Sequence, residues 1–112
     1  MTDTWPTIAG LVAWLDDANE PSDHETAMRL MKLSEEVGEV TEAYIGYIGQ
    51  NPRKGVTHTA SDVADELCDV IVTAMVALNL FAGDPEQHLA DKLAKIAARV
   101  GVQAGEQHAD PA

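Results

Sequence analysis

KLSEEVGEV at residues 32–40 and DELCDVI at residues 65–71 are the two stretches that decide the fold. In each stretch two acids stand three positions apart, Glu36 with Glu39 and Glu66 with Asp69. Residues at this spacing lie on neighbouring turns of one helix face, so each stretch predicts two carboxylates side by side. The apolar residues around the acids also follow helical spacing and not the alternation of a strand. We therefore expect two helices, each with an acidic pair.

Periodicity and punctuation extend these two helices and add two more, giving helices at about residues 5–18, 23–48, 60–81 and 85–100. Residues suited to cap them precede each start: Thr4, Ser22, Thr59 or Ser61, and Asp84. A loop, GQNPRKG at residues 49–55, separates the two acidic helices. Short connections favour antiparallel neighbours, so the sequence predicts an all-α fold with a four-helix bundle-type protomer.

The third helix carries the run VIVTAMVAL at residues 70–78, which is apolar almost all round. A helix of this kind is usually buried on several sides. The second helix has a clear apolar side, made by Leu30, Leu33, Val37, Tyr44 and Ile48. We expect the third helix to be central, with a second copy of the chain covering part of it, so that the protein oligomerises through its helices.

The chain has 112 residues, which fits a single domain at residues 1–101, followed by a flexible tail at residues 102–112. Seven basic and 19 acidic residues give a net charge of −12, which argues against nucleic acid or an anionic membrane as partner. No signal peptide or membrane span is apparent, and the single cysteine, Cys68, excludes an intrachain disulfide. These features predict a soluble, cytoplasmic protein, with Cys68 packed in its core.

The two acidic pairs face each other if their helices pack antiparallel. Four converging carboxylates repel one another unless a cation neutralises them, and Mg²⁺ prefers oxygen ligands of this kind. The opposing interpretation is a solvated acidic face, which is the usual role of acids on helices. Gly38 in mid-helix favours a close approach by a backbone or ligand. No Glu-x-x-His pair faces the acids and no Cys/His set exists, which disfavours di-iron and zinc.

The two acidic stretches, in this order and on successive helices, resemble the signature of the MazG-like, all-α nucleoside triphosphate pyrophosphohydrolases. The similarity spans roughly residues 27–99. It implies an enzyme that hydrolyses an NTP or dNTP to the monophosphate and pyrophosphate, with Mg²⁺ as cofactor and Mn²⁺ as a substitute. It also implies a homodimer or homotetramer. By resemblance the metal ligands are Glu36, Glu39, Glu66 and Asp69.

The same resemblance assigns further residues. Glu35 would be an additional ligand or would orient the attacking water, Asn79 would contact the nucleotide, and Lys92 would contact phosphate. The family usually has an asparagine four residues after that lysine, where this chain has Ile96, and this departure bears on the choice of base.

Other residues allow two interpretations each. Arg53 and Lys54 form a basic pair in the loop, which either closes over the triphosphate or is a solubilising loop tip. Trp5 and Trp14 either pack at a core or subunit contact or stack on a base. Two rival functions also stay open. One is a related pyrophosphohydrolase acting on phosphoribosyl-ATP, and the other is a non-catalytic helical binding or regulatory module.

Overall fold

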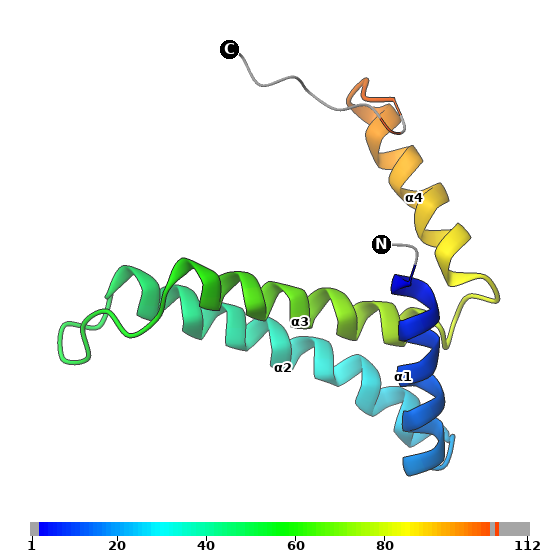
Figure 1. Ribbon diagram of the computed structural model, residues 1–112, viewed down its shortest axis with the longest axis horizontal. Helices are drawn as coiled ribbons and strands as arrows, with labels where there is room; N and C mark the ends of the chain where they lie inside the picture. Colours follow the sequence, from blue (N-terminus) through cyan, green and yellow to red (C-terminus); the bar gives the residue numbers. More distant parts are fainter. Residues whose placement is uncertain (1–2, 104, 106–112) are drawn as a thin grey trace.

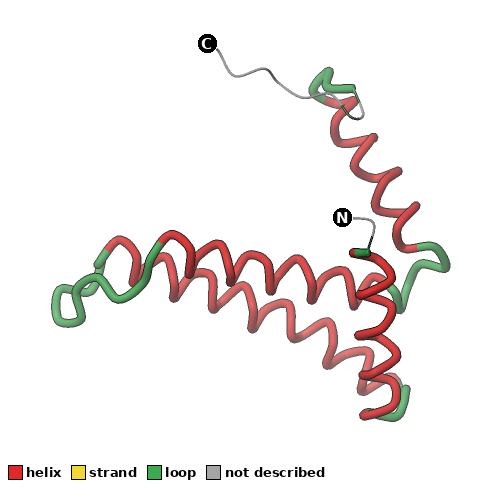
Figure 2. Tube along the Cα trace, viewed as in Figure 1, coloured by secondary structure: helices red, strands yellow, loops and turns green. Residues whose placement is uncertain are grey.

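The structure, a computed structural model, describes residues 3–103 and 105. These residues form helices joined by loops and turns, and contain no strand, as Figure 2 shows. The helices are α1 (Thr4–Ala18), α2 (Asp23–Ile48), α3 (Ala60–Leu78) and α4 (Pro85–Arg99). The all-α prediction is therefore confirmed. Most of the predicted tail at residues 102–112 lies outside the described residues.

Local capping signals set most helix ends. Ser22 accepts a hydrogen bond from the backbone N–H of Glu25, and Asp84 accepts one from Gln87. Thr59 and Asp62 form a reciprocal capping box at the start of α3, so the cap is Thr59 and not Ser61. These bonds satisfy N–H groups that have no partner within the helix.

Two expected helix ends were wrong. Thr4 is the first residue of α1, and Asp3 precedes it without a side-chain capping bond. Helix α3 ends at Leu78, three residues earlier than expected, because residues 79–81 close into turn-type backbone hydrogen bonds.

Helices α2 and α3 pack against each other as an antiparallel pair, the main packing contact of the protomer (Figure 1). Gly49 ends α2 with a φ of 65°, a left-handed conformation that glycine adopts without steric cost. The returning chain then lies close against Gly46, whose carbonyl accepts a 3.0 Å hydrogen bond from the Thr57 N–H. A Cβ at Gly46 would overlap side-chain atoms of Thr57 and His58, so a larger residue there would displace them.

The side of α2 that is buried differs from the predicted apolar side. Its buried residues are Arg29, Glu36, Ala43 and Gly46, and most of the predicted stripe is exposed. The buried Gly46 lies against Thr57 and His58 of the returning loop, and the buried Glu36 belongs to the acidic side. The expected meeting of the two acidic pairs is confirmed, whereas the apolar side of α2 is left mostly uncovered, because periodicity shows an apolar side without showing what covers it.

Helix α3 is likewise more exposed than expected. Only Val76 and Ala77 are buried among its residues, whereas Ile71 is 56 % exposed. Val37 and Leu67 each directly follow an inward-facing glutamate, so each lies about 100° round its helix from the contact line. Because the two helices run antiparallel, a turn of about 100° from the contact line brings Val37 and Leu67 to the same side of the pair. We call this side the apolar face; its members are Leu30, Val37, Tyr44, Ile48, Leu67 and Ile71.

Helix α1 crosses the end of the pair where α2 begins and α3 ends (Figure 1). Ile8 is its buried residue, and Asp16 binds Arg29 of α2 at 2.8 Å. Helix α4 projects away from the other helices and has no extensive packing against them. A single protomer is therefore a helical pair with a crossing helix, and α4 does not complete a closed bundle within it. None of the helices in the described residues has both the length and the apolar character of a membrane span.

Candidate metal centre

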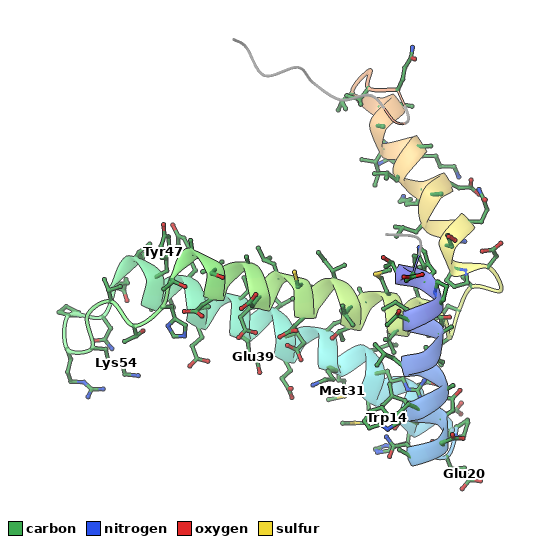
Figure 3. The ribbon with its side chains drawn as sticks, viewed as in Figure 1. Trp14, Glu20, Met31, Glu39, Tyr47 and Lys54 are labelled. Atoms are coloured by element: carbon green, nitrogen blue, oxygen red, sulfur yellow. The ribbon has the colours of Figure 1, made fainter. Side chains whose placement is uncertain are left out.

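The four acids of the two sequence stretches come together between α2 and α3. Each contributes one carboxylate oxygen to a group in which all atoms lie within 4.8 Å of one another. The members, called the acid cluster below, are Glu36, Glu39, Glu66 and Asp69. Glu36 is buried, Asp69 is exposed, and the other two are half-buried. In Figure 3, Glu39 and Met31 project from the same side of α2.

The cluster is electrostatically strained without a cation. The negative charge of Glu36 raises the pKa of Glu39, and partial burial and the nearby Glu66 carboxyl raise it further. Glu36 Oε2 and Glu66 Oε2 are also buried, and neither has a hydrogen-bond partner. A buried carboxylate oxygen without a donor carries a desolvation cost that a bound cation would remove.

The donor set fits a hard divalent cation. All four ligands are carboxylate oxygens, the type that Mg²⁺ and Mn²⁺ prefer. Oxygens on opposite sides of an octahedral Mg²⁺ lie about 4.2 Å apart, close to the spread of this cluster. The residues present therefore fit the ion that the sequence predicted.

Lys32 and Glu35 border the cluster. The Lys32 ammonium lies 3.0 Å from Glu35 Oε1 and 3.2 Å from Glu36 Oε1. Hydrogen bonds to Glu35 and then to Glu36 raise the pKa of Lys32. Glu35 itself is exposed and stands outside the group of four, and apart from its contact with Lys32 it faces solvent beside the cluster.

A pocket of about 580 Å³ opens next to this border, between α1, α2 and α3. Lys32 and Glu35 line it on the side of the cluster, and Leu11, Trp14, Met28 and Met31 line it elsewhere. Trp14 is 65 % exposed and lines this pocket, so part of its side chain is accessible to a ligand. Mostly apolar walls with a few polar groups are typical of small-molecule sites.

The remaining predicted site residues lie away from the cluster in one protomer. Arg53 and Lys54 are in the loop beyond Ile48, about 14 Å along α2 from Glu39. Asn79 follows the end of α3, about 15 Å beyond Asp69, and its amide donates to the Met75 carbonyl.

Lys92 is on α4, which projects away from the pair. The structure therefore brings the acids together without the predicted substrate-binding residues.

Two basic residues of the site region were missed by the sequence analysis. Arg29 is buried and binds both Asp16 and Glu25, which ties α1 to α2 beside the pocket. Lys32 contacts the cluster directly. Both have acidic partners three or four residues away, at Glu25 for Arg29 and at Glu35 and Glu36 for Lys32, and this helical spacing was the available signal.

Two smaller expectations also need correction. Cys68 is exposed and not in the core, because it lies on the outer side of α3. The space beside Gly38 is open within the protomer, so the close approach in α2 is at Gly46. Comparisons with models of known families, with curated protein sequences and with solved structures find no match to this chain.

Proposed function

We propose that this protein is a Mg²⁺-dependent pyrophosphohydrolase of the MazG-like kind, which converts a nucleoside triphosphate to the monophosphate and pyrophosphate. The observation that carries the proposal is the acid cluster, in which Glu36 and Glu66 each bury an unpartnered carboxylate oxygen. Buried orphan oxygens are costly in a merely solvated acidic face and are explained by a cation. Mn²⁺ would substitute for Mg²⁺, since both take carboxylate ligands.

The proposed reaction requires a cation between the acid cluster and the triphosphate, because both are negatively charged. A bound divalent ion would offset the negative charge of the triphosphate and align it for in-line attack by water. The acid cluster would hold the ion, and Glu35 would accept a hydrogen bond from the attacking water at the edge of the cluster. Attack breaks one phosphoanhydride bond, and pyrophosphate leaves. A chain of net charge −12 needs such neutralisation to bind an anionic substrate.

The adjacent pocket supports a nucleotide as the substrate. Glu35 and Lys32 belong to both the pocket wall and the border of the cluster, so a molecule in the pocket reaches the acids. We place the nucleoside there, with the base against Trp14, and the triphosphate toward the acids. Stacking on an exposed indole needs only a flat π-face, which every base has.

The active form is proposed to be a homodimer or homotetramer. The apolar face carries six large side chains, and their exposed fractions run from 43 % at Leu30 to 56 % at Ile71. Large exposed apolar patches of this kind are typical of protein–protein contacts.

A second copy would also explain why the predicted substrate-binding residues lie far from the acid cluster of their own protomer. Arg53, Lys54, Asn79 and Lys92 would contribute to phosphate or nucleotide binding from a neighbouring protomer. We assign the activity to the cytoplasm, where nucleotides are plentiful and a protein with one cysteine needs no disulfide.

A panel of NTPs and dNTPs with Mg²⁺ and pyrophosphate detection tests the proposal, with phosphoribosyl-ATP as an additional substrate. We expect turnover of at least one nucleotide and loss of at least about 100-fold in Glu39→Gln, since even outer-shell changes cost 10- to 100-fold. Turnover of phosphoribosyl-ATP alone would move the assignment to the related enzyme. If nothing is hydrolysed and neither Mg²⁺ nor Mn²⁺ raises the melting temperature, the chain is a non-catalytic module.

A further inference from the structure

Among the ion pairs of the described residues, one joins a basic side chain to the acid cluster, and that side chain is Lys32. Its ammonium bridges Glu35 Oε1 at 3.0 Å and Glu36 Oε1 at 3.2 Å. Glu36 is the most deeply buried acid of the cluster, with a side chain only 10 % exposed, whereas the Lys32 side chain is 54 % exposed. The lysine therefore reaches inward from the surface and supplies positive charge where four carboxylates converge.

This contact conflicts with a bound divalent cation. Without metal, the ammonium offsets part of the repulsion among the carboxylates. With metal on the same acids, the ammonium would stand near a second, doubly charged cation, and in a partly buried site this repulsion is only weakly screened. Lysine has a flexible four-carbon stem, so the exposed Lys32 can change partner without moving the backbone.

The position of Lys32 in the wall of the pocket indicates which group its ammonium would pair with instead. Lys32 lines its wall together with Glu35, on the side that faces the acids. A substrate with its nucleoside in the pocket and its phosphates toward the cluster would pass this ammonium. Phosphate oxygens form charge-assisted hydrogen bonds with an ammonium, and these would replace bonds to carboxylates whose charge a divalent ion already offsets.

We propose that Lys32 exchanges partners, pairing with Glu35 and Glu36 in the metal-free protein and with the phosphates of the substrate once metal is bound. This inference rests on the proposed function and adds a phosphate-binding residue to it. It makes Lys32 a competitor of the metal and a partner of the substrate, so removing its charge has opposite effects on the two ligands.

The test is Lys32→Met, which keeps the length of the stem and removes the charge. Mn²⁺ binding to the nucleotide-free protein is measured by electron paramagnetic resonance, and the KM for the best nucleotide is measured at saturating Mg²⁺. We expect Mn²⁺ to bind on the order of tenfold more tightly, and KM to rise on the order of tenfold, since each tenfold change corresponds to the loss of one modest charge interaction. Lys32→Arg, which keeps the charge, is expected to shift both values much less.

The matched control is Lys95→Met, the same charge change on α4, away from the cluster and the pocket. It should leave Mn²⁺ affinity and KM within about twofold of wild type, because distant surface charges are screened. An Mn²⁺ affinity in Lys32→Met that is unchanged or weaker overturns the competition, and an unchanged KM overturns the phosphate contact. Lys32→Gln repeats the measurement should the methionine variant fold poorly.

The two proposals fail in different ways. If wild type neither binds Mn²⁺ nor turns over a nucleotide, the proposed function is wrong, and the partner exchange falls with it. If wild type does both and Lys32→Met lacks the opposed shifts, only the role of Lys32 is wrong.

Discussion

Glu36 of α2 and Glu66 of α3 meet across the antiparallel pair, and each buries one carboxylate oxygen that has no hydrogen-bond partner. Of the other two acids in the cluster, Glu39 is half-buried, as Glu66 is, and Asp69 is exposed. The most unfavourable charges are therefore those held between the two helices. These charges should lower the stability of the metal-free protein, and under the proposed function they should favour a cation; both effects can be measured.

Replacing Glu66 by glutamine should raise the melting temperature of the metal-free protein and abolish its stabilisation by Mg²⁺. The substitution removes one buried charge from the repulsive cluster and one ligand from the metal. A gain of about 1 kcal/mol corresponds to about 4–8 °C in a domain of this size. Calorimetry with and without Mg²⁺ measures both effects.

Glu42→Gln provides the control for this substitution. Glu42 is exposed on α2 and is not a member of the acid cluster. Its loss should leave Mg²⁺ stabilisation as in wild type. Metal stabilisation that survives in Glu66→Gln would show that Glu66 is not a ligand.

The stability of the metal-free protein should fall as pH rises above 4.5. The pKa of Glu39 is raised from its ordinary value of 4.5, chiefly by the charge of Glu36. Between 4.5 and the raised value the folded protein binds more protons than the unfolded chain, so the free energy of unfolding falls as pH rises through this window. Denaturant titrations over a series of pH values measure this slope.

Metal binding should have the opposite dependence, because the ligands must be deprotonated. Mn²⁺ affinity should rise as pH increases through the same window. Glu39→Gln removes the titrating group, so its stability should vary less with pH than that of wild type. An equal pH dependence in the variant would assign the effect to another group.

Trp14→Ala should raise KM while changing kcat little. The indole is exposed at the pocket, and stacking on a base contributes about 1–3 kcal/mol, which is roughly 5- to 150-fold in KM. Phe81→Ala is a close control, since Phe81 is also 65 % exposed and does not line the pocket. A KM that is the same in Trp14→Ala and wild type would place the base elsewhere.

Ile71→Asp should dissociate the oligomer and abolish turnover. Ile71 belongs to the apolar face, and burying a carboxylate there against a second copy would be costly. Size-exclusion chromatography with light scattering gives the mass, and the pyrophosphate assay gives activity. Val56→Asp is the control, because Val56 is 70 % exposed in the loop and lies outside that face. A wild-type chain that is monomeric and active would refute the proposed assembly.

The positions of the helices could be predicted from the sequence with good accuracy. Helix α2 has the expected bounds, Asp23–Ile48, because Ser22 caps its start and Gly49 adopts the left-handed conformation at its end. The spacing of the acidic pairs also predicted the cluster, since residues three apart share a helix face and the short loop makes α2 and α3 antiparallel. These are local or nearly local effects.

Only the tertiary structure decided what covers the apolar side of each helix. The apolar stripe of α2 is mostly exposed, whereas Ala43 and Gly46 are buried on the side of α2 that carries the acids. It also placed Arg29 and Lys32 at the site, and α4 away from it. Periodicity identifies the sides of a helix, but the rotation of one helix against another depends on contacts between distant residues, which a pattern along the chain does not contain.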